Sequence, residues 1–318
     1  MYYIGVDLGG TNIAVGIVDE NGKILKKGSV PTGALRNPDE IVKDMAELAK
    51  KLLSELGIGI EEVEYAGIAA PGTIDSEKGE VVYSNNIPLL HYPMAQKLKD
   101  FLGVEKVYIE NDANAAAKGE YACGVSKGSR SAVLITLGTG LGGGIVIDNK
   151  IYSGFNFGGA ELGHTVIEVD GRPCTCGRRG CWETYSSATG LIKMTKEKME
   201  ECRDSLMWAL CEGDIAKVSG RTAFDAMKKG DAAGKEVVDM YIKYLGIGIT
   251  NMINIFQPEM FVIGGGVCNE KEYLTVPLNE IIEKDQYTRN NPAELKTKVC
   301  IAQLGNDAGI IGAAMLGR

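Results

Sequence analysis

The sequence has 318 residues, which is enough for two domains of ordinary size. Hydrophobic residues make up 45% of the chain and charged residues 24%, as in a soluble globular protein. The net charge of −8 disfavours a nucleic acid as a partner, and charges, glycines and prolines interrupt every apolar run, so we expect no membrane-spanning helix.

The first predicted elements are strands. Residues 3–8 and 13–18 are apolar stretches, and Asn21-Gly22 after the second one favours a hairpin turn because it supplies positive φ angles. A helix is predicted from Pro38 to residue 56, with Asn37 as its cap and Gly57 at its end.

The rest of the chain alternates between strands and helices. Strands are expected over 64–70, 105–109 and 260–263, and helices over 231–256 and 307–316. His91 lies between Pro88 and Pro93, and we interpret it as a structural or incidental residue in a loop.

The N-terminus and the cysteines predict a cytoplasmic protein. The first residues, MYYIGVDLGG, have neither the basic region nor the apolar core of a secretory signal. Five of the eight cysteines stand singly among apolar or helical neighbours, which is typical of reduced thiols and not of a disulfide framework.

The chain contains an internal repeat. Residues 6–19 read VDLGGTNIAVGIVD and residues 135–148 read ITLGTGLGGGIVID, with the same order of strand, glycine-rich turn, strand and acidic turn. This order favours a duplicated α/β domain over coincidence. We expect a smaller lobe, 1–115 plus 306–318, and a larger lobe, 116–305, that face each other across a ligand-binding cleft.

The glycine-rich turns are candidate phosphate sites. Gly138-Thr139-Gly140-Leu141-Gly142-Gly143 matches G-x-G-x-x-G, but a strand and not a helix follows, so a dinucleotide-binding fold is excluded, and no Walker motif exists. Backbone N–H groups of such turns can surround phosphate oxygens. Two related turns and a third glycine cluster, 264–266, favour phosphate binding over glycines that merely permit tight hairpins.

Asp7 is an acid inside an apolar strand. A buried carboxylate needs a partner, and two partners are open. Asp7 either accepts hydrogen bonds from nearby backbone amides or holds a metal-bound water beside the phosphates of ATP.

His164, Cys174, Cys176 and Cys181 form the pattern H-x9-C-x-C-x4-C. Three thiolates and one imidazole fill a tetrahedral Zn²⁺ site and leave no position for a reactive water, so the predicted zinc is structural. Gly177 and Gly180 allow the loop 164–181 to turn tightly. The alternative, unliganded thiols beside a core histidine, is disfavoured because free cysteines rarely cluster this closely.

Three motifs together resemble the ROK family of bacterial sugar kinases and repressors. They are Asp7-Leu8-Gly9-Gly10-Thr11, Glu161-Leu162-Gly163-His164 and CTCGRRGCWE, and the string CTCGRRGCWETYSSATGL is most similar to the glucokinases of that family. The resemblance covers nearly the whole chain. It implies an actin-like, ribonuclease H-like duplicated α/β fold, ATP and Mg²⁺ as cofactors, phosphorylation of a hexose 6-hydroxyl, and a structural Zn²⁺.

The resemblance also assigns roles to individual residues. It makes Asp112 the catalytic residue, and the sugar-binding residues are then Gly72, Asn85 or Asn86, Asn111, Asp112, Glu161, His164 and Glu183. It places Thr11, Asn12, Thr139, Gly140 and Gly265 on the nucleotide side, to which the glycine turns and the buried acid described above add Asp7, Gly9, Gly10 and Gly138. Position 14 departs from the pattern, because Ala14 stands where some members have a basic residue near the phosphates.

The residues support this chemistry independently. Phosphoryl transfer needs charge neutralisation and a base for the attacking hydroxyl, and Asp112 follows an apolar strand at its predicted C-terminal end. The alternative for Asp112 is to cap the helix that follows, which is compatible with catalysis.

Several alternatives remain at this point. Within the family, N-acetylmannosamine, fructose or allose can replace glucose, and polyphosphate can replace ATP. A sugar-responsive repressor is disfavoured because the first glycine motif begins at residue 7, which leaves no room for a helix-turn-helix segment. An actin-like filament protein would need neither the cysteine cluster nor the sugar carboxylates. We expect a homodimer or homotetramer that binds hexose and ATP, with no nucleic-acid or membrane partner.

Overall fold

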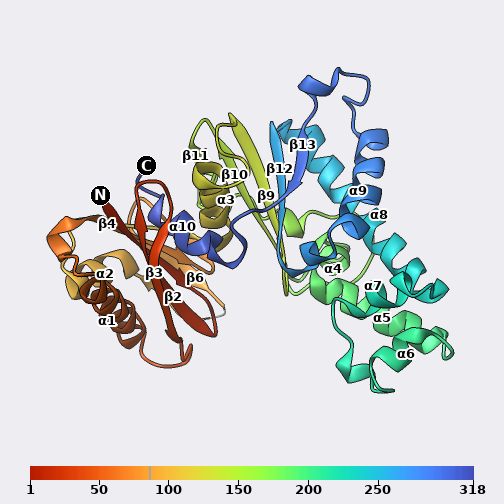
Figure 1. The fold of residues 1–318 in the computed structure, drawn as a ribbon, viewed down its shortest axis with the longest axis horizontal. Helices are drawn as coiled ribbons and strands as arrows, with labels where there is room; N and C mark the ends of the chain where they lie inside the picture. The colour runs from red at the N-terminus through yellow and green to blue at the C-terminus, as the bar shows by residue number, and fades with distance from the viewer. Residues whose placement is uncertain (86) are drawn as a thin grey trace. The chain divides into compact units, whose positions relative to one another are not determined.

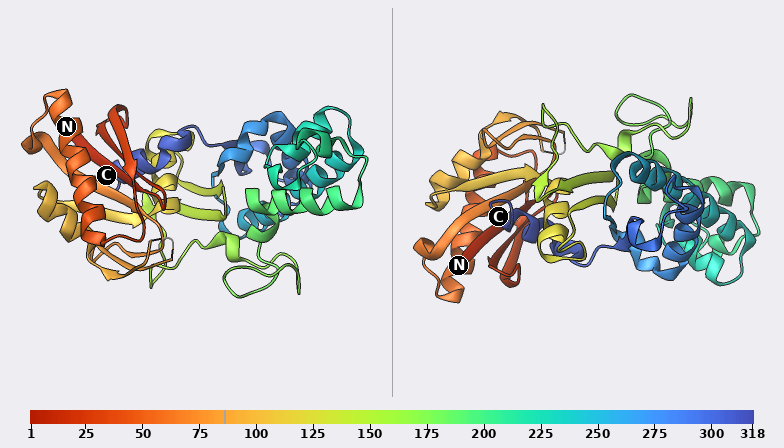
Figure 2. Two further views of the ribbon diagram at one scale, coloured as in Figure 1. Left: turned by 90° about the horizontal axis from the view of Figure 1, so that it is seen from below. Right: turned by 90° about the horizontal axis from the view of Figure 1, so that it is seen from above.

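The computed structural model describes residues 1–85 and 87–318, which form two compact units. The first unit comprises residues 1–134, 144–160 and 302–318, and the second comprises 135–143 and 161–301. The boundary expected at residue 115 falls inside helix α3 (Asp112–Cys123), all of which lies in the first unit. Because the chain returns to the first unit at residue 302, both termini lie on that unit (Figures 1 and 2).

The first unit contains a five-stranded sheet in the order β3-β2-β1-β4-β8. Its strands are β1 (Tyr2–Leu8), β2 (Asn12–Asp19), β3 (Ile24–Pro31), β4 (Val63–Ala70) and β8 (Val107–Asn111). β2 runs antiparallel to β1 and β3, whereas β4 is parallel to β1 and β8 is parallel to β4. The strands predicted from the sequence are present, although β8 starts two residues later than expected.

A second sheet repeats this order as β11-β10-β9-β12-β13. Its strands are β9 (Ser131–Leu137), β10 (Leu141–Ile147), β11 (Lys150–Ile151), β12 (Met260–Gly264) and β13 (Lys298–Ile301). In both sheets the third, second, first, fourth and fifth strands along the chain are neighbours in that order. This shared topology confirms the duplication that residues 6–19 and 135–148 predict.

Helices cover both faces of the first sheet. Alternate residues of β1 point to opposite faces: Ile4 belongs to the core cluster under α1 (Pro38–Leu56), whereas Tyr3 packs with α10 (Ala308–Ala314). A Cβ at Gly5 would lie 2.0 Å from the carbonyl oxygen of Ile310, so only glycine admits α10 at this distance. Asp7 shares the face of Tyr3 and Gly5, and its carboxylate lies against Gly309 of α10.

The predicted end signals of α1 are confirmed. The Asn37 side chain accepts a hydrogen bond from the backbone N–H of Asp39, Pro38 is the first helical residue, and Gly57 adopts the left-handed conformation that ends the helix. This cap fixes where α1 starts against the sheet.

A small antiparallel sheet, β5-β6-β7, consists of Thr73–Asp75, Glu80–Ser84 and Leu89–Tyr92. His91 belongs to β7, with its Nδ1 atom 2.5 Å from Glu80 Oε1 on the neighbouring strand. The loop expected around His91 is therefore wrong, because strand pairing outweighs the two flanking prolines.

The remaining helices include the long helix predicted over 231–256. They are α2 (Met94–Leu102), α4 (Glu183–Ser186), α5 (Ala188–Glu201), α6 (Leu206–Leu210), α7 (Thr222–Lys228), α8 (Ala232–Phe256) and α9 (Glu272–Asp285). Gln257, in the left-handed conformation, ends α8. Trp182, fully buried, packs on Gly248 of α8, where a Cβ would lie 1.9 Å from the indole ring.

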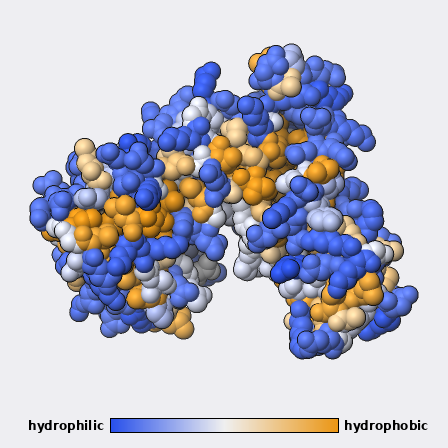
Figure 3. All heavy atoms as spheres, viewed as in Figure 1, coloured by the Kyte–Doolittle hydropathy of each residue, from blue (hydrophilic) through white to orange (hydrophobic). Residues whose placement is uncertain are grey.

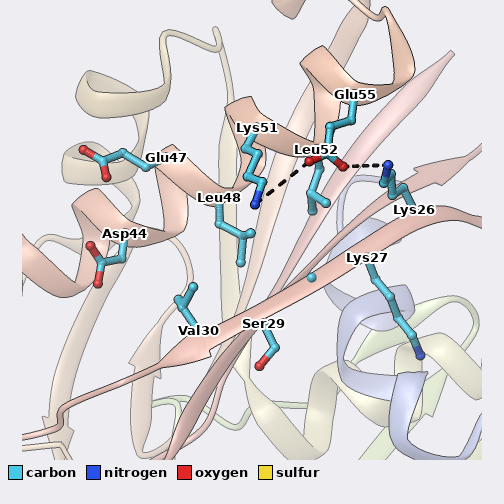
Figure 4. Close-up of a pocket in the computed structure, with 11 residues that line it drawn as sticks. Lys26, Lys27, Ser29, Val30, Asp44, Glu47, Leu48, Lys51, Leu52 and Glu55 are labelled. Atoms are coloured by element: carbon cyan, nitrogen blue, oxygen red, sulfur yellow. Dashed lines mark ion pairs between the residues drawn. The ribbon is translucent and has the colours of Figure 1, made fainter.

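Hydrophilic residues dominate the face of the protein drawn in Figure 3. A groove of about 400 Å³ lies between β3 and α1, and Figure 4 shows that charged side chains surround it, with Lys26 and Lys51 both paired to Glu55. None of the predicted site residues lines this groove. Among the described residues, no helix combines the length and apolarity that crossing a membrane requires.

Candidate active site

The turn between β1 and β2 carries the first predicted phosphate-binding residues. The Gly9 N–H donates to the Asn12 carbonyl (2.9 Å), and the Thr32 hydroxyl donates to the Gly9 carbonyl (2.6 Å). These bonds fix the turn, while Gly10, Thr11 and Asn12 are exposed. The geometry therefore presents backbone and hydroxyl groups to a ligand from an anchored turn.

Asp7 lies one residue before the end of β1, close to a second carboxylate. Burial, together with the charge of Asp112, raises the pKa of Asp7 to about 6. Its carboxylate lies against α10, where a Cβ at Gly309 would be 2.5 Å from Asp7 Oδ2. Ala14 is its direct partner on β2, so no basic side chain offsets its charge from that strand. Two interacting carboxylates of this kind fit the ligand preference of a hard divalent cation.

Asn111 and Asp112 lie at the junction of β8 and α3. Asn111 Oδ1 accepts hydrogen bonds from the backbone N–H groups of Ala113 (2.9 Å) and Asn114 (3.2 Å), so Asn111 is the cap of α3. Asp112 is the first helical residue and also accepts from the Ala113 N–H (2.8 Å). Although the Asp112 side chain is in contact with solvent, desolvation by the surrounding protein raises the pKa of its carboxyl. A raised pKa makes this carboxylate a better proton acceptor.

Of the sugar-contact residues predicted near β5–β7, Gly72 lies beside the junction of β8 and α3. Asn111 Nδ2 donates to the Gly72 carbonyl (3.1 Å), and Gly72 has a φ of 105°. A Cβ at Gly72 would lie 2.1 Å from the Tyr83 carbonyl oxygen, so the position requires glycine. Asn85 is exposed and 3.5 Å from the Tyr83 hydroxyl, whereas Asn86 lies outside the described residues.

In the second unit, the four predicted zinc ligands converge. The ligand atoms of His164, Cys174, Cys176 and Cys181 all lie within 4.8 Å of one another, with His164 Nδ1 at 3.6 Å from Cys174 Sγ. Cys176 Sγ and Cys181 Sγ are also 3.6 Å apart. Zn–S bonds of about 2.3 Å and Zn–N bonds of about 2.0 Å in a tetrahedron place neighbouring ligand atoms roughly 3.5–3.8 Å apart, so the donor set fits zinc.

The loop that carries these ligands turns tightly at two glycines. Gly177 and Gly180 have φ values of 87° and 75°, in agreement with the predicted tight turns, and a Cβ at Gly180 would lie 1.7 Å from the Glu168 carbonyl oxygen. Burial and the neighbouring thiols raise the pKa of Cys181 to about 12. A bound cation reverses this effect, because it stabilises the thiolate directly.

Glu183 joins the cysteine cluster to the second glycine-rich turn. Its Oε2 atom accepts a hydrogen bond from the Leu141 N–H (2.8 Å), and its Oε1 atom lies 4.0 Å from Cys174 Sγ. A Cβ at Gly140 would lie 2.4 Å from Glu183 Oε2, so this carboxylate lies directly against the turn. The sequence predicts Glu183 as a sugar contact and does not predict this structural role.

The other predicted glycines of the second unit also come together. The Gly138 N–H donates to the Gly140 carbonyl (3.0 Å) in the β9–β10 turn, where Thr139 is exposed. Gly265 has a φ of 99°, and a Cβ there would lie 2.3 Å from the Leu137 carbonyl oxygen. The third glycine cluster, 264–266, therefore lies beside the β9–β10 turn, with which it was predicted to bind phosphate.

Sequence reasoning missed a buried acid beside Asn111. Glu110 is 5% exposed and accepts hydrogen bonds from the Asn111 N–H, Asn114 Nδ2 and Ser153 Oγ. The available signal was the acid within the apolar strand VYIEND, which is the argument applied to Asp7.

Comparison with known proteins agrees with this geometry. The chain matches the ROK family over residues 3–318. It is 39% identical over 315 residues to a glucokinase of Thermotoga maritima, covering 98% of this chain and 96% of that protein. It is 29% identical over 317 residues to an N-acetylmannosamine kinase of Citrobacter koseri, covering 99% and 98%.

A solved structure extends the similarity to the fold. The crystal structure of a ROK family glucokinase from Streptomyces griseus, in complex with glucose and AMPPNP, has a TM-score of 0.81 and 35% identity, with 99% of each chain covered. The duplicated α/β architecture is that of the actin-like fold. This chain belongs to the ROK family.

Proposed function

We propose that this protein is an ATP-dependent hexose kinase that phosphorylates the 6-hydroxyl of glucose. The observation that carries the proposal is the position of Asp112, a solvent-accessible carboxylate with a raised pKa at the carboxyl end of β8. Two supporting observations are the anchored glycine turns and the identity to glucokinases across almost the whole chain.

In this reaction Asp112 is the general base. It accepts the proton of the sugar 6-hydroxyl as that oxygen attacks the γ-phosphorus of ATP. The bond between the γ-phosphorus and the bridging oxygen breaks, and ADP leaves with that electron pair. Asn111 retains one N–H of its amide after donating to Gly72, and this donor is available to a sugar hydroxyl.

The remaining sugar contacts are proposed for Gly72, Asn85 or Asn86, Glu161, His164 and Glu183. Because His164 Nδ1 lies next to Cys174 Sγ, its Nε2 atom is the nitrogen left for a hydroxyl. Glu183 Oε2 is already engaged by the Leu141 N–H, so Oε1 is the oxygen proposed to accept from the sugar.

The phosphates are proposed to bind the backbone of Gly9–Asn12, Gly138–Gly140 and Gly265, with the Thr11 and Thr139 hydroxyls as further donors. Mg²⁺, when bound with the nucleotide, neutralises phosphate charge, and Asp7 would hold it through a coordinated water. Since Ala14 supplies no positive charge, neutralisation depends more on the cation and on backbone N–H groups.

Zn²⁺ is proposed as a structural ion held by His164, Cys174, Cys176 and Cys181. With all four positions taken by protein, it would order the loop that presents Glu161 and Glu183.

A panel of hexoses with ATP and Mg²⁺ tests the substrate. Glucose should give a higher kcat/KM than N-acetylmannosamine, fructose or allose, and replacing ATP with polyphosphate should lower the rate. If another sugar is preferred by about tenfold, equivalent to roughly 1.4 kcal/mol of transition-state stabilisation, glucose is not the substrate. If no sugar is phosphorylated, the proposed kinase activity is wrong.

A further inference from the structure

Glu110 is a buried carboxylate whose hydrogen-bond donors in the described part of the chain are all neutral. It is 5% exposed in β8, next to the junction that carries Asp112. Burial raises the pKa of Glu110, and its hydrogen bonds oppose that rise. A carboxylate kept in such a place without a cationic partner is costly, so its contacts deserve a functional explanation.

The donors to Glu110 come from two separate segments. Oε1 accepts from the Asn111 N–H (2.9 Å) and from Asn114 Nδ2 (3.1 Å), which flank Asp112 in the chain. Oε2 accepts from Ser153 Oγ (3.4 Å), forty-three positions further along. One side chain therefore ties the start of α3 to the segment after β11.

The contact with Asn114 has a defined orientation. Asn114 is 3% exposed, and its Oδ1 atom has no hydrogen-bond partner among the described residues. Rotating the amide would point this oxygen at the Glu110 carboxylate, which is repulsive. The nitrogen of the Asn114 amide therefore faces Glu110, and this bond holds the first turn of α3.

Ser153 begins a tight loop that leads to Glu161. The Gly159 N–H donates to the Ser153 carbonyl (2.8 Å), and a Cβ at Gly159 would lie 2.7 Å from the Ser153 carbonyl carbon. Within the loop Phe155 is 98% exposed, and Phe157 has an unfavourable φ of 61°. A strained loop with an exposed tip depends on the anchoring of its ends.

We propose that Glu110 is a positioning residue: its carboxylate holds Asp112 and the loop 153–159 in one fixed arrangement without contacting either substrate. The kinetic part of this inference rests on the proposed function, because it needs Asp112 to be the base. On this proposal Glu110 acts through the geometry of its hydrogen bonds and not through its charge. Gln retains the geometry, because its oxygen accepts from Asn111 and Asn114 while its amide donates to the Ser153 hydroxyl.

Three substitutions test this role by steady-state kinetics on glucose. Glu110→Ala should lower kcat by about 10²-fold, the effect of displacing a catalytic group by roughly 1 Å. Glu110→Gln should remain within about threefold of the parent kcat, with an unchanged acid limb in its pH profile. Ser153→Ala, which removes one donor, should raise the KM for glucose about fivefold with kcat within about twofold.

Hydrogen–deuterium exchange provides a reading that does not depend on activity. Exchange should rise over 111–117 and 153–159 in Glu110→Ala, and only over 153–159 in Ser153→Ala. If the parent phosphorylates no sugar, the proposed function fails, while these exchange patterns still decide whether Glu110 anchors both segments.

Glu120 of α3 is the matched control. It is fully buried and accepts from the Val125 N–H (2.9 Å) and the Leu304 N–H (2.7 Å), away from Asp112. Glu120→Gln should unfold at a lower urea concentration yet keep kcat within about twofold. The proposal is overturned if folded Glu110→Ala turns over within about twofold of the parent, if Glu110→Gln is as slow as the alanine variant, or if Glu120→Gln slows catalysis equally. If Glu110→Ala does not fold, an unchanged KM and unchanged exchange in Ser153→Ala would overturn it as well.

Discussion

Replacing Asp7 with Asn should stabilise the nucleotide-free protein, and the gain should grow with pH. Burial and the charge of Asp112 raise the pKa of Asp7 from 3.8 to about 6, so folding favours the protonated carboxyl. The stability that this preference contributes is fully present below pH 3.8 and is lost as the pH rises through 6. A shift of about 2.2 units at 1.36 kcal/mol each corresponds to roughly 3 kcal/mol in total, and about half of it develops between pH 5 and pH 8.

Urea denaturation at fixed pH, without Mg²⁺ or nucleotide, measures this quantity. The free energy of unfolding of Asp7→Asn minus that of the parent should increase by about 1.5 kcal/mol from pH 5 to pH 8. Adding Mg²⁺ and AMPPNP should reduce the difference, because a cation stabilises the ionised Asp7 of the parent.

Asp75 provides a control with the opposite sign. Burial acts to raise the pKa of Asp75, but hydrogen bonds from the Lys78 N–H and ammonium group outweigh it and lower the pKa. The stability from this carboxylate is present above its unfolded pKa and is lost as the pH falls toward the folded value. The Asp75→Asn difference should therefore be flat between pH 5 and pH 8. A flat or falling difference for Asp7→Asn over the same range would refute the electrostatic account of Asp7.

Three further predictions concern the proposed site. Asp112→Asn should lower kcat by about 10²–10⁴ with little change in sugar binding, and steady-state kinetics within about threefold of the parent would show that Asp112 is not the base. Cys176→Ser should abolish stoichiometric zinc and lower both the denaturation temperature and activity, since the loop presents Glu183; elemental analysis that still finds one zinc per chain would contradict the ligand set. Ala14→Lys should lower the pKa of Asp7, because directly opposed residues on antiparallel strands have Cβ atoms about 5 Å apart, and urea denaturation should then show a weaker pH dependence than in the parent.

Local signals in the sequence determined the elements and the metal cluster. Asn37 and Gly57 mark the ends of α1, and the strand pattern of residues 6–19 returns at 135–148, because caps and side-chain alternation depend on neighbours within a few residues. The convergence of His164 with the three cysteines was predictable for the same reason. Because the loop is short and turns at glycines, its four ligand side chains are confined to a small volume.

Only the tertiary structure decided which polar groups meet across long stretches of chain. The Ser153 hydroxyl donates to Glu110, and Glu183 accepts from the Leu141 N–H. Gly309, about 300 positions along the chain from Asp7, lies against the Asp7 carboxylate. Even the cap of α3 is Asn111 and not Asp112, because Asp112 is already the first helical residue. Such contacts depend on strand register and helix docking, where a shift of one residue turns a side chain to the opposite face, and no short-range pattern in the sequence carries that information.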